Sequence, residues 1–400
     1  MKNLRSILNG FLLLIIFSFN SFAQLSSFEL NGYAKYLFSS VKIPYFSERF
    51  SDHLIHTRIN TRWYPVESIS AALEARMRGF YGETVENFPN YIDQIKSKHD
   101  FVQLDYVAWN KNKSIGYVEI DRIWLDWQFK NFQTTIGRQR IAWGTSWVWN
   151  ITDLFNPLSI LDFDYEERPG VDAIRLQYYT GAVSKIEAAF TRGKTRGKSI
   201  AAVHAVMNKW NYDFHLLGGV KNNRWILGGA WSGDISGAGF RGEIVASAAP
   251  QKSATSINKI PRILGESLFD YDKPVFSLVL SGDYTFENSF YIHTEVLFNS
   301  NGKARNAAIH QFEAAELGML SPSRLSMFHE FSYNFTPLIR GSIFGLFNPN
   351  DKSFVAVPSL NWSILENFDL MLIALLFDGK PLSEFGGFGK MFFIRTKYSF

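Results

Sequence analysis

Alternation of apolar and polar residues runs through almost the whole chain and constrains its fold more than any other feature. Residues 55–63 read Ile-His-Thr-Arg-Ile-Asn-Thr-Arg-Trp, residues 174–178 read Ile-Arg-Leu-Gln-Tyr, and residues 292–298 read Ile-His-Thr-Glu-Val-Leu-Phe. A period of two is that of a β-strand with one polar and one apolar face. The chain is therefore predicted to be all-β.

The lengths of the links between strands indicate which kind of β-fold this is. Alternation alone fits both a water-soluble sandwich, with apolar faces inward, and a transmembrane barrel, with apolar faces toward lipid. Short links such as 130–131 and 181–182 alternate here with long ones such as 80–115 and 143–170. Outer-membrane barrels show this asymmetry because their periplasmic turns are tight and their outer loops long. We predict a transmembrane antiparallel β-barrel, with a secreted soluble β-fold as the alternative.

The pattern predicts eighteen strands. They are residues 28–39, 53–64, 67–79, 116–129, 132–142, 171–180, 183–191, 199–208, 211–220, 224–232, 238–247, 274–286, 289–299, 324–335, 337–347, 353–364, 367–377 and 389–400. Glycine and alanine blur the alternation between 199 and 247, so sixteen strands is the alternative count. An even number lets both ends of the barrel chain lie on the periplasmic side.

Both ends of the chain point to export and membrane assembly. Lys2 and Arg5, the apolar run 11–19 and the small residues before Gln24 predict a signal peptide, residues 1–23, removed after Ala23. The longest later apolar stretch, 370–377, is too short for a spanning helix. The last strand ends on Phe400, which resembles the terminal signature read by the barrel-assembly machinery of Gram-negative bacteria. The predicted location is the outer membrane, with lipid, lipopolysaccharide and that machinery as partners.

Charge is expected to separate between the two faces of the barrel wall. The formal net charge is +4, and removal of Lys2 and Arg5 leaves +2. The faces opposite the apolar ones carry many more Arg and Lys than Asp and Glu, the assigned acids being Glu74, Asp126, Glu187, Asp213 and Glu295. A basic lumen would concentrate anions. The predicted pore-lining residues are Arg58, Arg62, Arg76, Arg78, Arg122, Arg138, Arg140 and Arg175. The alternative is that these arginines pair with acids and fill the interior.

The segment 137–175 carries the most specific pattern in the chain. It begins Gly-Arg-Gln-Arg at a strand end, continues through a loop, and resumes with Gly-Val-Asp-Ala-Ile-Arg-Leu. Here the sequence resembles the alginate-export-type and related substrate-specific porins of Gram-negative outer membranes. That resemblance implies an electropositive conduit for acidic polysaccharide, lined by Arg138, Arg140 and Arg175.

The loop 143–170 is predicted to be an inward or capping segment. Its candidate constriction residues are Trp143, Trp147, Trp149, Phe155, Asp162 and Asp164. The aromatic rings would either narrow the pore and stack on sugar rings or join the aromatic girdle at the membrane interface. We expect the acids at 162–167 to form a solvated loop or to bind lipopolysaccharide through divalent ions, in preference to a dedicated Ca²⁺ site.

Several functional classes find no support in the sequence. There is no cysteine, and no nucleophile, phosphate-loop, dinucleotide or zinc-protease motif is present. We therefore expect no enzymatic activity, no cofactor and no metal site, and the modest charge does not suggest nucleic-acid binding. The predicted function is a porin-like channel for small anionic or sugar-type solutes. The alternatives are an export or surface-assembly barrel for acidic polysaccharide and a structural or adhesive barrel with a filled lumen.

Overall fold

The computed structural model describes residues 27–44, 46, 48–88, 90–96, 101–157, 160–194, 198–249 and 273–400. The predicted signal peptide, residues 1–23, lies outside this part of the chain. Among the described residues, no helix is long and apolar enough to cross a membrane.

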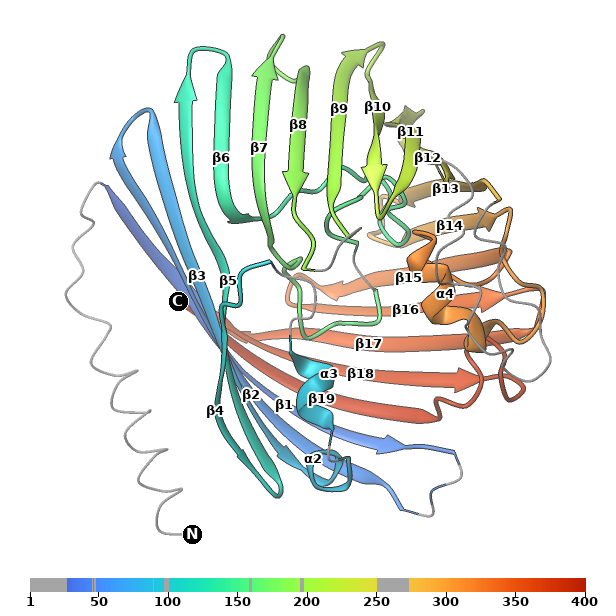
Figure 1. Ribbon diagram of the computed structural model, residues 1–400. Helices are drawn as coiled ribbons and strands as arrows, with labels where there is room; N and C mark the ends of the chain where they lie inside the picture. The colour runs from blue at the N-terminus through green and yellow to red at the C-terminus, as the bar shows by residue number, and fades with distance from the viewer. Residues whose placement is uncertain are drawn as a thin grey trace.

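The described residues form one antiparallel sheet that closes on itself. Its strands are β1 (Phe28–Lys42), β2 (Phe50–Val66), β3 (Ile69–Gly82), β4 (Asp105–Lys111), β5 (Ser114–Phe129), β6 (Phe132–Gln139), β7 (Val171–Tyr179), β8 (Lys185–Thr191), β9 (Ile200–Lys209), β10 (Tyr212–Lys221), β11 (Arg224–Ile235), β12 (Ala238–Ala248), β13 (Val275–Thr285), β14 (Tyr291–Asn299), β15 (Leu325–Thr336), β16 (Ile339–Asn348), β17 (Ser353–Leu365), β18 (Phe368–Asp378) and β19 (Lys390–Ser399). Pairing of β1 with both β2 and β19 closes the ring (Figure 1). Closure leaves the ring without a first or last edge.

The predicted count of eighteen strands is confirmed. Of the nineteen strands in the sheet, β4 pairs with β5 alone, and the ring passes directly from β3 to β5. Eighteen strands therefore close the barrel. The short helices α2 (Glu83–Asn87), α3 (Tyr91–Ile95), η2 (Ala307–His310) and α4 (Gln311–Glu316) lie in the long loops.

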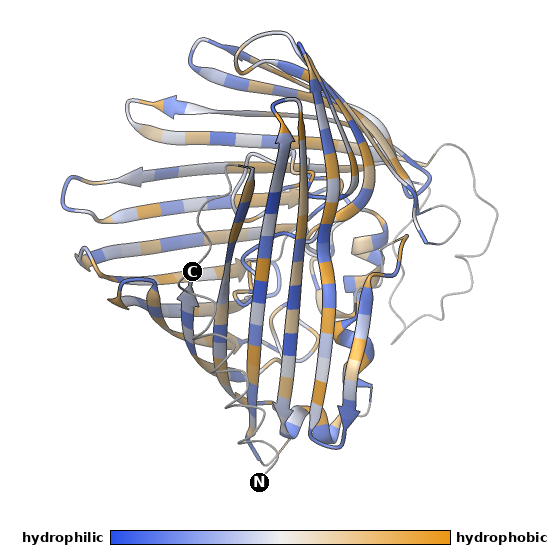
Figure 2. Ribbon diagram, turned by 90° about the vertical axis from the view of Figure 1, so that its left-hand side faces the viewer, coloured by the Kyte–Doolittle hydropathy of each residue, from blue (hydrophilic) through white to orange (hydrophobic). Residues whose placement is uncertain are grey.

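The apolar face of the wall points outward. Hydrophilic and hydrophobic residues alternate along the strands (Figure 2). Leu216 and Leu227, on β10 and β11, are each more than 60% exposed, whereas Glu187, Glu243 and Glu295 are buried on the opposite face. A soluble sandwich would bury the leucines and expose the acids, so this arrangement is that of a barrel surrounded by lipid.

A β-bulge shifts the alternation within β5. Glu74 pairs with Arg122 and Ala75 with Ile120, so Asp121 has no partner across the ladder. The extra residue lets Asp121 and Arg122 both reach the interior, where each makes an ion pair. A bulge changes the face of every later side chain on its strand, so strict alternation could not place Asp121.

Strand β4 was not predicted, because the sequence analysis treated 80–115 as one long loop. β6 pairs with β5 only from Ile123 onward, and β4 takes the neighbouring position along the rest of β5. The Trp109 ring covers Gly116 so closely that a Cβ at this glycine would lie 2.2 Å from it. The indole nitrogen of Trp109 also donates to Ser114 Oγ at 2.7 Å. Tight packing of the indole on a glycine holds this hairpin together.

Because the apolar side chains face outward, replacing one by a charged residue should destabilise the barrel. The loss of stability should depend on the depth of that residue in the membrane. Leu216 lies in the middle of β10, and Leu216→Arg should lower the free energy of unfolding by about 2–4 kcal/mol, because an arginine would face hydrocarbon. The matched control is Ile235→Arg, at the turn end of β11, where about 0–1 kcal/mol is expected. Urea unfolding in lipid vesicles, followed by tryptophan fluorescence, measures both. Equal costs at the two positions would contradict the assignment of Leu216 to the lipid face.

Candidate functional site

The loop between β6 and β7, residues 140–170, crosses the interior of the barrel (Figure 1). Trp143, Trp149 and Phe155 are buried in an apolar cluster with inward side chains of the wall, among them Leu217 and Val279. The sequence had suggested either a stacking surface for a solute or a place in the aromatic girdle. These three rings are instead enclosed in the interior. Trp147 differs, because 59% of it is exposed.

Glu243 on β12 holds the first part of this loop through its backbone. Oε1 accepts the N–H groups of Thr145 and Ser146 at 2.6 and 2.7 Å, and Oε2 accepts the N–H of Thr152 at 2.8 Å. The Thr152 hydroxyl adds a fourth bond at 2.9 Å. A carboxylate with several N–H donors makes strong, charge-assisted hydrogen bonds. Glu243 is fully buried, so these hydrogen bonds replace the hydration that its carboxylate loses.

Glu295 on β14 holds the following residues in the same manner. Its carboxylate accepts the N–H groups of Trp147 and Trp149, at 3.2 and 2.6 Å. Ser281 and Glu295 pair across β13 and β14, and Arg241 on β12 pairs with Ser281, so the two anchoring carboxylates lie on nearby strands. Two neighbouring side chains of the wall therefore fix the direction of the loop through at least five backbone donors.

The second part of the loop, residues 162–167, is held by polar and charged side chains of β1, β2 and β19. We call it the acidic limb. His56 Nδ1 lies 2.9 Å from Asp164 Oδ2, and Lys35 donates to the Asp164 carbonyl at 2.6 Å. Glu166 bridges two cations of β19, which are Arg395 at 2.6 Å and Lys397 at 2.8 Å. Tyr33 donates to Glu167 at 3.0 Å.

These acids, which the sequence predicts to form a solvated or lipopolysaccharide-bound loop, contact the inner wall, although Asp162 and Glu166 stay exposed. Burial alone would raise the pKa of Asp164, but the hydrogen bond and charge of His56 outweigh it, and the pKa lies below its ordinary value. Lys35 and Arg395 likewise hold the pKa of Glu166 below its ordinary value, against the effect of burial. Asp162 accepts the N–H of Tyr165 at 3.3 Å, and burial raises the pKa of its carboxyl. Ion pairs with the wall thus hold Asp164 and Glu166, of which Asp164 is half-buried and Glu166 stays exposed.

All eight predicted pore-lining arginines lie on the inner side, but they differ in environment. Arg58, Arg76 and Arg138 are buried in ion pairs and do not line water. The pairs are Arg58 with Asp121 at 2.6 Å and Glu74 at 2.5 Å, Arg76 with Glu119 at 2.8 Å, and Arg138 with Asp172 at 2.8 Å. Half-buried pairs are Arg62 with Glu74 at 2.7 Å, Arg78 with Glu119 at 3.8 Å, Arg122 with Glu74 at 3.3 Å, and Arg175 with Glu187 at 2.5 Å.

This pairing reduces the predicted excess of positive charge. Glu119, Asp121 and Glu243 are inward acids that alternation did not predict, and the acidic limb adds further negative charge. Glu119 and Asp121 were missed because the bulge disturbs the alternation, and Glu243 because glycine and alanine blur it in that region. The sequence did contain one signal for Glu243. It is a lone acid between Gly242 and Ile244, in a segment that is otherwise small or apolar.

Arg140 is the exception among the predicted residues. It follows β6, is exposed, and makes no ion pair with any residue in the part of the chain that the structure describes. Burial of part of the side chain, together with repulsion by Arg168 and Arg122, lowers the pKa of Arg140. The Arg122 side chain donates to the Arg168 backbone carbonyl at 3.0 Å, while the Arg168 guanidinium pairs with Asp153. The three arginines form a group that we call the arginine cluster.

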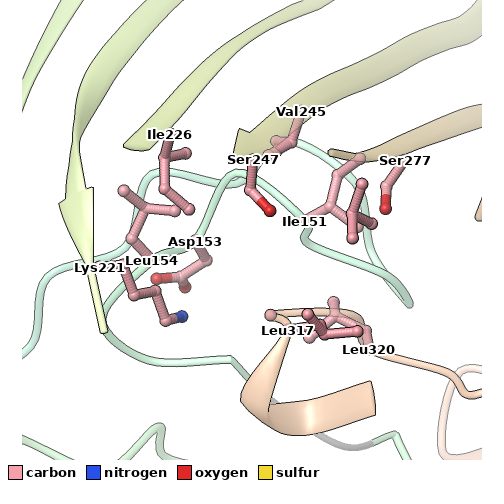
Figure 3. A pocket seen from close by; sticks show the side chains of 12 residues that line it. Ile151, Asp153, Leu154, Lys221, Ile226, Val245, Ser247, Ser277, Leu317 and Leu320 are labelled. Carbon is pink, nitrogen blue, oxygen red and sulfur yellow. The ribbon is translucent and has the colours of Figure 1, made fainter. Parts of the chain in front are cut away.

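The loop packs tightly against the wall on its other side. A cavity of about 20 Å³ remains between the loop, β10 to β13 and the segment after α4. Lys221 and Asp153 lie together in it, and Leu317 and Leu320 line the opposite side (Figure 3). This volume accommodates about one water molecule, so it is not a solute site.

The described residues contain no group of three His, Cys, Asp or Glu side chains that could hold a metal ion.

Comparison with known proteins identifies the fold. No protein-family model matches the sequence, and a search of curated proteins finds no match. The structure is similar to those of Gram-negative outer-membrane porins. Acinetobacter baumannii OccAB3 matches with a TM-score of 0.58 and 10% identity over 94% of this chain and 100% of that one. OccAB1 from the same organism matches with a TM-score of 0.54 and 11% identity over 94% and 96%.

Pseudomonas aeruginosa OccK11 (OpdR) matches with a TM-score of 0.54 and 6% identity over 93% of this chain and 95% of that one. At such low identities the similarity shows the fold alone. It agrees with the closed antiparallel barrel of eighteen strands. The finer resemblance to alginate-export-type porins stays a prediction.

Because the Glu243 carboxylate holds the loop, a single substitution at this position should weaken attachment of the loop to the wall. Glu243→Gln replaces one acceptor oxygen by an amide that faces N–H donors, and it should weaken attachment of the loop by about 3 kcal/mol. Limited proteolysis of the folded barrel within 143–157 should become measurably faster. Glu366→Gln, on an exposed turn, is the matched control. Unchanged proteolysis in Glu243→Gln would show that the carboxylate does not hold the loop.

The acidic limb predicts a pH dependence of known sign. Because the pKa values of Asp164 and Glu166 are lowered in the attached state, their contribution is present above the ordinary carboxyl pKa. It is lost as the pH falls through the lowered values. Hydrogen exchange of the backbone at 162–167 should therefore show loss of protection in acid, after correction for the intrinsic exchange rate. The double variant Asp164→Asn and Glu166→Gln should show reduced protection already at neutral pH. Protection that is the same in the variant and the native chain would contradict this role.

Proposed function

We propose that this protein is a porin-like channel of a Gram-negative outer membrane that passes small anionic or sugar-type solutes. The fold and its similarity to outer-membrane porins support the membrane location and a channel function. Side chains exposed to water inside the barrel lie on both sides of the loop. Arg140 is at the extracellular end of β6, and Trp147 and Arg340 face the periplasmic half.

The single observation that carries the anionic preference is the arginine cluster. Most interior arginines are neutralised by a carboxylate, and in the cluster Arg122 pairs with Glu74 and Arg168 with Asp153, whereas Arg140 is exposed and makes no ion pair with a described residue. Uncompensated positive charge in a channel with low-dielectric walls attracts anions and raises their local concentration. The loop 140–170 begins at Arg140, so an entering anion would meet this charge where the lumen narrows.

A second candidate is a structural barrel with a filled lumen. The apolar cluster around Trp143, the two glutamate anchors and the acidic limb fix the loop to several sides of the wall. Conductance separates the two candidates, because a filled barrel carries no steady current.

Planar-bilayer recording with asymmetric KCl tests the proposal. The reversal potential should have the sign of an anion-selective channel. Arg140→Gln should reduce the anion-to-cation permeability ratio roughly fivefold, since one charge near a passing ion contributes about 1 kcal/mol in water. Lys209→Gln, an exposed charge at a turn, is the control and should leave the ratio unchanged. Cation preference in the native chain would refute the anionic preference, and absence of current would favour the filled barrel.

A further inference from the structure

A second group of aromatic and charged side chains lies on the periplasmic side of the loop and is separate from the arginine cluster. It comprises inward residues of five neighbouring strands, β12 to β16, together with Trp147 of the loop. Glu295 fixes the position of Trp147 by accepting its backbone N–H at 3.2 Å. Since Glu295 belongs to the same wall, the indole is held at a defined place above these strands.

The indole of Trp147 forms an exposed aromatic surface inside the barrel. Arg241 lies 5.4 Å from the ring centroid, and the His293 ring meets the indole in an edge-on contact at 6.0 Å. His293 is itself fixed, with Ser281 Oγ at 3.0 Å from its Nε2 atom. These contacts restrain the ring but leave 59% of the residue exposed. The exposed part of the indole is an aromatic face that a ligand can cover.

Two guanidinium–carboxylate pairs belong to this group, one beside the ring of Trp147 and the other beside the ring of Tyr291. Arg241 on β12 pairs with Asp283 on β13, and Arg340 on β16 lies 3.6 Å from Glu330 on β15. The pairs contain two positive and two negative charges, so the local field does not select an ion of either sign. They do offer several hydrogen-bond donors and acceptors in fixed positions, as guanidinium and carboxylate groups do.

Tyr291 on β14 lies between the two pairs. Its ring is 5.9 Å from the Arg340 guanidinium and 6.4 Å from the ring of His293. Its hydroxyl is buried and has no hydrogen-bond partner among the described residues. A buried hydroxyl without a partner carries a desolvation cost, which a ligand hydroxyl or a bridging water would remove.

We propose that Trp147, Tyr291 and the pairs Arg241–Asp283 and Arg340–Glu330 form a binding subsite for an uncharged pyranose ring. The apolar face of a pyranose fits against an indole, and its hydroxyl groups can bond to both guanidinium and carboxylate groups. An ion would gain little here, because the charges are balanced. The inference deepens the proposed function by naming a solute class for the periplasmic half of the channel, and it rests on that function.

Two measurements with maltotriose as the probe test the subsite. Isothermal titration calorimetry on the detergent-solubilised full chain measures binding directly, and block of the bilayer current measures occupation of the channel. Trp147→Ala should weaken maltotriose binding roughly five- to tenfold, because the stacking surface is lost, while Trp147→Phe should keep most of the affinity. Trp225→Ala, a lipid-facing tryptophan, is the matched control and should bind as the native chain does.

A further variant separates ligand binding from structural damage. Tyr291→Phe removes a hydroxyl that has no partner in the described structure, so unfolding by urea should be unchanged or slightly harder. Binding of maltotriose should weaken about threefold. Sorbitol, an acyclic polyol without a ring face, should bind the native chain much more weakly than maltotriose does.

The outcomes distinguish this inference from the proposed function. Native chain that conducts but neither binds maltotriose nor is blocked by it would overturn the subsite and leave the channel standing. Binding that Trp147→Ala weakens, in a barrel that carries no current, would support the subsite and overturn the channel. Binding that is equal in the native chain and Trp147→Ala would also overturn the subsite.

Discussion

Pairing of the backbone in hydrocarbon is the constraint on which the rest of this structure depends. Lipid offers no partner to a peptide N–H or C=O group, so a spanning sheet must satisfy all of them itself. Here β19 closes onto β1, and eighteen strands form the ring. Closure in turn determines that each strand has one face toward lipid and one toward the lumen. Alternate residues of each strand therefore determine the chemistry of the interior.

Most charged side chains in the confined interior form ion pairs with side chains of the opposite charge. Arg58, with Asp121 and Glu74, is the clearest case, because all three side chains are buried. Removing one partner would leave a buried charge unpaired, which costs several kcal/mol. The wall thus uses most of its charges for structure. The few side chains that remain exposed, Arg140 and Trp147 among them, become the features that a solute can meet.

The loop 140–170 divides the interior into two chemically different regions. Glu243 and Glu295 hold its first part by backbone N–H groups, and His56 of β2 together with cations of β1 and β19 holds the acidic limb. The arginine cluster lies at the start of the loop, and the proposed aromatic subsite lies toward the short turns that precede β12, β14 and β16. Anchoring through backbone groups leaves the loop side chains free to differ in role. Trp143 packs in an apolar cluster, whereas Trp147, four residues later, is exposed.

Alternation in the sequence determined the fold class, the number of strands in the ring and the direction of the side chains, because a period of two records which residues share a face. It could not place β4, since a strand that pairs with one neighbour inside a long loop has no separate signature. It also could not place Asp121, because a bulge is a change in pairing and leaves no mark on local composition. Which charges neutralise each other, and which aromatic rings stay exposed, was decided only by tertiary structure. Asp164 and His56 lie 108 positions apart in the chain, and only closure of the barrel and entry of the loop bring them within 2.9 Å.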